Sequence, residues 1–159
     1  MHLPKLKERI FPVGRLDYDS SGLLLLTNDG QLANRLTHPR YQVKKVYLVK
    51  VKGEPNPSEL LKLEKGIFLD GKKTAPARVR MIVQAPRRSL VRMEIFEGRK
   101  REVRRMFEAI GCRVVGLERI SVGGLCLGKL RKGAWRFLTF QEVCLLRKQV
   151  NLEEKSKFA

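Results

Sequence analysis

The chain has 159 residues, a length that suits one domain with a substantial hydrophobic core. Its 34 lysines and arginines outnumber 16 acidic residues, and the formal net charge of +18 predicts a polyanionic partner, with nucleic acid favoured over an anionic membrane surface. A soluble basic surface without such a partner is the alternative. No apolar run approaches the ~20 residues that cross a bilayer, and the first residues lack the apolar core of a signal peptide, so we expect no membrane association.

The first half of the chain is expected to alternate short strands with short helices. Residues 22–27 form a brief apolar run between turn residues, which predicts a buried strand. Asp29 suits the N-cap of the helix that follows. Residues 43–52 are rich in β-branched side chains and alternate, which predicts a strand. One face of that strand carries Lys45, Tyr47, Val49 and Val51. The other elements expected are a strand over 9–13 and helices over 31–36 and 58–63, the latter closed at Gly66.

The second half is expected to hold longer elements. Residues 77–83 and 90–96 alternate in polarity and predict a hairpin across a basic loop that contains Arg88. A helix is expected from the basic loop 97–101 to Ile110, because its apolar residues recur at helical spacing. The remaining elements expected are strands over 113–122 and 125–127 and a helix over 140–148, which Thr139 and Glu142 begin as a capping box.

These elements predict the α+β class, with flanking helices and a central mixed, largely antiparallel sheet, because strands outnumber helices and neighbouring strands suit antiparallel pairing. Residues 1–150 are expected to form one domain, and residues 151–159 a frayed C-terminal tail.

The sequence offers no expected metal site. Its three cysteines are an odd number without CxxC spacing, which indicates reduced thiols in a cytoplasmic protein. The two histidines, His2 and His38, are far apart and near no cysteine. We therefore expect no catalytic metal.

Three features carry candidate chemistry. Tyr47 is aromatic and polar, and it lies on the predicted strand face that also carries Lys45. Asp17 lies on the loop that leads into the predicted leucine strand, where a carboxylate is either a turn or cap residue or a functional group on a rigid support. An arginine cluster surrounds the start of the helix that ends at Ile110. Because cations oppose the helix dipole at that end, the cluster predicts bound anions, either phosphates or a carboxylate, with a solvated helix face as the alternative. Its members are Arg99, Arg101, Arg104 and Arg105.

The stretch GRLDYDSSGLLLLTNDG at residues 14–30 resembles the signature of the RsuA/RluB-type ribosomal RNA pseudouridine synthases. Three further stretches are similar to the family in the same order, and the likeness runs from about Phe11 to Leu146. The residues RKRE at 99–102 and GAW at 133–135 resemble the large-subunit branch more than the small-subunit branch. The three stretches are LTHPRYQVKKVYLVKV, EGRKREVRRMFEAIG and RISVGGLCLGKLRKGAWRFLT.

The resemblance implies a pseudouridine synthase catalytic fold with an RNA-binding cleft, and isomerisation of a specific uridine in ribosomal RNA without a metal or organic cofactor. It implies that Asp17 is the catalytic carboxylate, that Tyr47 lies beside the target base, and that Arg104 pairs with the carboxylate. The basic residues expected to hold RNA are Arg15, Lys45, Arg99, Lys100, Arg101 and Arg105. We expect a cytoplasmic monomer.

The start of the chain departs from the family pattern. The family's lysine-proline-glycine motif upstream of the GRLD stretch is absent, as is the usual small N-terminal RNA-binding domain. We therefore expect a truncated start. The alternative function is a catalytically inactive or truncated module that binds ribosomal RNA or assists ribosome assembly.

Overall fold

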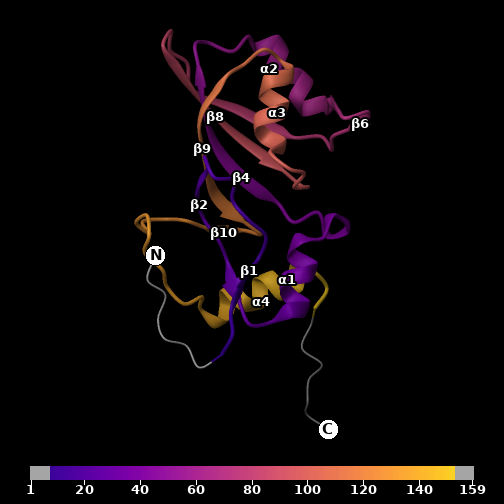
Figure 1. Ribbon diagram of the computed structural model, residues 1–159, viewed down its shortest axis with the longest axis vertical. Coiled ribbons are helices and arrows are strands. Elements are labelled where there is room, and N and C mark those ends of the chain that lie inside the picture. The colour runs from indigo at the N-terminus through magenta and orange to yellow at the C-terminus, as the bar shows by residue number, and fades with distance from the viewer. Residues whose placement is uncertain (1–7, 153–159) are drawn as a thin grey trace.

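The computed structural model describes residues 8–152 (Figure 1). Its main sheet has six strands, in the order β10-β9-β4-β8-β7, with β2 also paired to β9. Every pairing is antiparallel except that of β2 with β9. The predicted α+β class and mixed, largely antiparallel sheet are confirmed. The strands are β2 (Ser21–Gly22), β4 (Lys45–Lys52), β7 (Arg78–Val83), β8 (Arg88–Ile95), β9 (Val114–Val122) and β10 (Leu125–Cys126).

One hydrophobic core lies between the sheet and two helices, α2 (Pro57–Lys65) and α3 (Glu102–Ala109). The two helices lie beside each other at one end of the molecule (Figure 1). The apolar stripe of α3 is buried as its helical spacing predicts, and Phe107 is completely inaccessible. Val49 and Val51 of β4 lie in this core and Tyr47 packs against it, as expected for residues that share one face of the strand.

A second core joins α1 (Gly30–Thr37) and α4 (Phe140–Gln149) to a two-stranded sheet of β1 (Phe11–Pro12) and β3 (Leu26–Thr27). These helices lie at the opposite end from α2 and α3, with β4 and β9 in between (Figure 1). The predicted caps are confirmed. The Leu32 amide donates to the Asp29 carboxylate at 2.9 Å, and Thr139 begins α4 with a capping box.

The predicted strand over residues 22–27 is wrong. Only the two ends of the predicted segment are strands: Gly22 ends β2, which pairs with β9, and Leu26 and Thr27 form β3, which pairs with β1. Gly22 has φ of +109°, and beyond it the Leu23 amide donates to the Arg119 carbonyl at 2.7 Å. The chain therefore leaves one sheet and enters another within the run, while Leu23 and Leu25 stay buried in the second core. An apolar run shows that a segment is buried but does not show which partner it meets.

Shorter elements complete the structure. The predicted hairpin of β7 and β8 is confirmed, but Arg88 is the first residue of β8 and not a loop residue. The turn at residues 70–71 joins β5 (Phe68–Leu69) to β6 (Lys72–Lys73) in a small separate hairpin. A 3-10 turn, η1 (Pro39–Tyr41), follows α1. The expected frayed tail lies almost wholly outside the described residues, and no helix within residues 8–152 has the length and apolarity that crossing a membrane requires.

Candidate functional site

A pocket of about 340 Å³ lies where the two cores meet. Val13 and Leu36 of the second core form part of its wall, and Ile95 and Val103 of the first core form another part. Its polar residues come from the loop after β1, from the end of α1, from β4 and β9, and from the loop before α3 and the start of α3. The volume falls at the lower end of the range typical of small-molecule sites. The predicted polar and charged residues that line it are Arg15, Asp17, Lys45, Tyr47, Arg99, Lys100 and Arg101.

Asp17 lies on the loop between β1 and β2, partly buried, at the edge of this pocket. The backbone closes the turn, because the Ser20 amide donates to the Asp17 carbonyl at 2.9 Å. Within residues 8–152 the carboxylate of Asp17 makes no hydrogen bond or ion pair and caps no helix. Of the two interpretations of Asp17, the geometry therefore favours a carboxylate available to a bound molecule.

The Asp17 loop is held against β9 by a close backbone approach at Gly22. A Cβ atom on Gly22 would lie 2.2 Å from the carbonyl oxygen of Arg119, well inside contact distance. Arg119 in turn donates from Nε to the Leu23 carbonyl at 2.8 Å and from its guanidinium to the Arg15 carbonyl at 3.4 Å. The loop is thus fixed on both sides of Asp17, which keeps the carboxylate at a defined position in the pocket.

Tyr47 and Lys45 bring β4 into the pocket. Tyr47 lies opposite Arg119 in the pairing of β4 with β9. Burial raises the pKa of the Tyr47 phenol, while the charge and hydrogen bond of Arg119 oppose that rise. Burial lowers the pKa of Lys45, and the nearby positive charge of Arg119 lowers it further. The Lys45 amine lies 3.4 Å from the Glu97 carbonyl, so its position depends on the end of β8.

Arg119 belongs to this site, although the sequence reasoning did not single it out. It is only 5% exposed and lines the pocket. Its neighbours on the same face of β9, Leu117 and Ser121, are also buried. The sequence does carry an indication of this role, since Arg119 is a charged residue at an inward position of an alternating strand. Arginine is rarely buried there without partners. Its guanidinium places a fixed positive charge beside Tyr47 and near the Asp17 loop.

The predicted pairing of Arg104 with Asp17 is not observed. Arg104 is 5% exposed, and its Nε atom lies 3.2 Å from the carboxylate of Asp19. A terminal nitrogen of Arg104 also donates to the Asp19 carbonyl at 2.7 Å. Arg101 binds the same carboxylate through two bonds of 2.9 and 3.1 Å, and this hydrogen bonding lowers the pKa of Asp19. The two arginines therefore fasten the loop to α3 through an acid two positions beyond Asp17.

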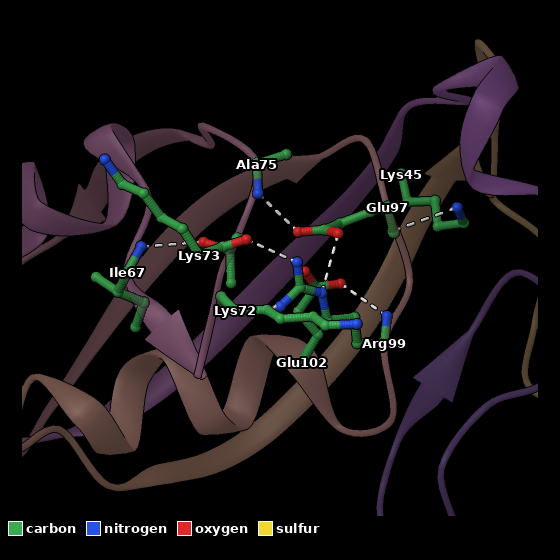
Figure 2. A network of polar contacts seen from close by, with 9 residues as sticks. Lys45, Ile67, Lys72, Lys73, Ala75, Glu97, Arg99 and Glu102 are labelled. Atoms are coloured by element: carbon green, nitrogen blue, oxygen red, sulfur yellow. Dashed lines mark hydrogen bonds and ion pairs between the residues drawn. The ribbon is translucent and has the colours of Figure 1, made fainter. Parts of the chain in front are cut away.

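The other basic residues divide into two groups. Arg15 and Lys100 are exposed at the pocket and remain available to an anion. Arg99 instead donates to the carbonyls of Lys72 and Lys73 at 3.0 and 2.7 Å (Figure 2). Arg105 forms an ion pair of 2.5 Å with Asp70 and is not among the pocket residues. Much of the arginine cluster thus has partners inside the protein, which explains how cations are tolerated at this helix start. No group of three histidine, cysteine or acidic side chains suited to a metal ion occurs in residues 8–152.

Comparison with known proteins agrees with the fold and the motifs. The family model described as RNA pseudouridylate synthase matches residues 2–109. The chain is 52% identical over 145 residues to ribosomal large subunit pseudouridine synthase B of Bacillus subtilis (strain 168), covering 89% of this chain and 59% of the relative. It is 40% identical over 146 residues to ribosomal large subunit pseudouridine synthase E of Xanthomonas campestris, covering 82% and 78%.

A crystal structure of a pseudouridylate synthase superposes with a TM-score of 0.81 at 37% identity, covering 86% of this chain and 59% of that one. The chain thus spans about three fifths of the length of the Bacillus relative and of this solved structure. The matched family and the similarity over most of the chain agree with the motif resemblance. The chain belongs to the RNA pseudouridylate synthase family.

Proposed function

We propose that the protein isomerises a specific uridine in ribosomal RNA, of the large subunit, to pseudouridine. The observation that carries the proposal is that Asp17 and Tyr47, remote in sequence, line one pocket in a chain of this family. The names of the Bacillus and Xanthomonas relatives support the large-subunit substrate. The net charge of +18 supports a ribonucleic acid partner held through its phosphates.

The chemistry requires the target base to leave the stack and enter the pocket, at a cost of a few kcal/mol. The bond between the sugar and N1 of uracil then breaks, the base turns, and C5 bonds to the sugar. C5 loses its proton and N1 gains one, so the atoms balance without a co-reactant. This balance supports a reaction that needs no cofactor. Asp17 acts as the carboxylate, by attack on the sugar or the base or by removal of a sugar proton.

We assign the roles of the surrounding residues in the reaction from their positions in the pocket. Tyr47 supplies a flat face for the base, where stacking contributes roughly 1–3 kcal/mol. Arg119 supplies the fixed positive charge that balances an ionised Asp17 in the closed complex, since a buried carboxylate requires a counter-charge. Arg104 acts through Asp19 by positioning the loop.

Ribosomal RNA is held at the pocket rim by the basic residues whose charge remains available. Arg15 and Lys100 make the direct phosphate contacts, and Lys45 and Arg101 contribute positive potential beside them. Arg99 and Arg105 act mainly by shaping the surface, because their guanidinium groups are engaged within the protein. The proposal includes a monomer as the acting form and a cytoplasmic location, where ribosomal RNA lies.

The test is replacement of the carboxylate with its amide, Asp17→Asn. Tritium release from ribosomal RNA labelled at C5 of uridine is expected to fall to background, while RNA affinity changes little. Glu108→Gln is the matched control, because this exposed acid lies outside the pocket and makes no ion pair among residues 8–152. Activity of Asp17→Asn equal to that of the control would exclude an essential role for Asp17. RNA binding by an inactive wild-type chain would favour the alternative, a module that binds ribosomal RNA without modifying it.

A further inference from the structure

Two glutamates that the proposed reaction does not use lie at the two ends of a loop in the pocket wall: Glu102 lines the pocket, and Glu97 directly precedes the lining residue Gly98. Glu97 follows β8, and Glu102 is the first residue of α3. The loop between them, residues 98–101, carries three of the basic residues that line the pocket. Glu102 is 3% exposed and itself lines the pocket. The pair therefore brackets the segment that presents positive charge to a bound molecule.

The polar contacts of Glu97 are nearly complete (Figure 2). One carboxylate oxygen accepts from the Ala75 amide at 2.7 Å, and the other accepts from Nε of Arg99 at 3.1 Å. The guanidinium of Arg99 continues to the carbonyls of the hairpin residues Lys72 and Lys73. Glu97 is thus the ionised member, and it ties the pocket loop to the hairpin of β5 and β6.

The contacts of Glu102 are incomplete. Its Oε2 atom accepts from the Arg99 amide at 3.0 Å, and its own amide donates back to the Arg99 carbonyl at 3.2 Å. Its Oε1 atom is buried and has no hydrogen-bond partner among residues 8–152 when the group is treated as a carboxylate. A buried unpaired carboxylate oxygen is costly. A proton on Glu102 removes that cost, because the protonated carboxyl can donate to Glu97.

We propose that Glu97 and Glu102 share one proton and act as a positioning pair that fixes the loop 98–101 and Lys45 at the pocket wall. Burial, followed by the hydrogen bond with Glu97, raises the pKa of Glu102 to about 8. Burial acts in the same direction on Glu97, but the hydrogen bonds from Glu102 and Ala75 and the charge of Arg99 outweigh it and lower the Glu97 pKa. The pair holds one negative charge at neutral pH.

The charge of the pair matters to the reacting groups. Ionised Glu102 or Glu97 would raise the pKa of Lys45, and ionised Glu102 would raise that of Tyr47. The Lys45 amine also lies 3.4 Å from the Glu97 carbonyl and close to Gly98. Loss of the shared proton would place two carboxylates against each other and loosen the Arg99 contacts. The charged and titratable groups that face the pair or share its pocket are Arg15, Asp17, Lys45, Tyr47, Arg99, Lys100, Arg101 and Arg119.

The first experiment measures the proton directly and does not depend on catalysis. The ¹³C resonances of the glutamate carboxyls are followed in the wild-type chain from pH 4 to 10, with Glu102 assigned by its absence in Glu102→Gln. We expect Glu102 to titrate near pH 8. The backbone amides of Arg99, Lys72 and Lys73 should shift with the same midpoint, and that shift should be absent in Glu102→Gln. Titration of Glu102 near its ordinary pKa of about 4.3 would overturn the shared proton. Amide chemical shifts that do not change with the midpoint of the Glu102 titration would overturn the positioning role.

The second experiment rests on the proposed isomerase function and uses a pH profile. Glutamine at position 102 can donate to Glu97 and accept from the Arg99 amide, so Glu102→Gln should keep activity within about threefold at pH 7. Wild-type activity should decline as the pH rises through about 8, where Glu102 loses its proton, and Glu102→Gln should lack that decline. Glu102→Ala should lose about tenfold or more at every pH, since both contacts disappear. Glu108→Gln, on the exposed face of the same helix, should follow the wild-type profile.

The two proposals fail in different ways. An alkaline decline that persists unchanged in Glu102→Gln would overturn the role of the pair even if Asp17 proves essential. A wild-type chain without isomerase activity would remove the proposed function, and the carboxyl and amide titrations would still decide whether the pair exists and holds the loop.

Discussion

Substitution of Arg119 tests whether Arg119 or Arg104 supplies the positive charge beside Asp17. We consider Arg119→Met, which keeps an unbranched side chain and removes the charge. The substitution deprives the Leu23 carbonyl of a hydrogen bond of 2.8 Å and the Arg15 carbonyl of one of 3.4 Å. Arg15 lies in the Asp17 loop and Leu23 lies just beyond β2, so one contact is lost on each side of Asp17. It also removes the positive charge that faces the Tyr47 phenol.

The cost to stability follows from those contacts. Loss of a charged donor to a buried carbonyl costs about 1–3 kcal/mol, so we expect Arg119→Met to lose roughly 2–4 kcal/mol of unfolding free energy. For a domain of this size that loss lowers the melting temperature by roughly 5–15 °C. The effect on catalysis should be larger. Removal of one fixed electrostatic group at a reacting centre lowers kcat by about 10²–10³, and we expect a loss in that range.

The assay is single-turnover tritium release, measured well below the melting temperature of each variant. Arg104→Met is the matched control, because Arg104 is equally buried but contacts Asp19. The expected order of activity loss is Arg119→Met, then Arg104→Met, then Arg88→Ala, whose side chain is exposed at the start of β8. If folded Arg104→Met loses as much kcat as Arg119→Met, Arg119 is not the counter-charge and the reasoning is wrong.

Three further predictions follow from the contacts described above. Gly22→Ala should lower the unfolding free energy by about 3 kcal/mol or more, because the new Cβ meets the Arg119 backbone and φ is positive. The urea midpoint should fall accordingly, and a wild-type midpoint would contradict the close approach. The raised pKa of Glu102 means that the native state binds a proton that the unfolded state has lost between pH 4.5 and 8. Stability should therefore fall as pH rises through that window, by up to about 1.4 kcal/mol per pH unit, and the fall should be smaller in Glu102→Gln. RNA affinity measured by filter binding should fall by about 10³–10⁵ between 50 and 200 mM salt, the loss expected for ~6–10 phosphate contacts. An affinity that does not change with salt would contradict phosphate-based binding.

Local signals in the sequence determined much of the fold. Alternation predicted β4, helical spacing predicted the buried stripe of α3, and short polar motifs predicted the caps of α1 and α4. These features depend on residues within one or two turns of each other, so the chain alone specifies them. The motifs also indicated the family and led to Asp17 and Tyr47, which the structure brings to one pocket.

Tertiary structure decided which side chains meet. The two ends of the segment 22–27 join different sheets, because Gly22 pairs with β9 and Leu26 and Thr27 pair with β1. Arg104 meets Asp19 and not Asp17, two acids of one short loop that sequence spacing cannot distinguish. The roles of Arg119, Glu97 and Glu102 likewise come from burial against distant strands. Burial and electrostatic coupling depend on every group packed around a side chain, and those neighbours are remote in the chain, so only the folded protein determines them.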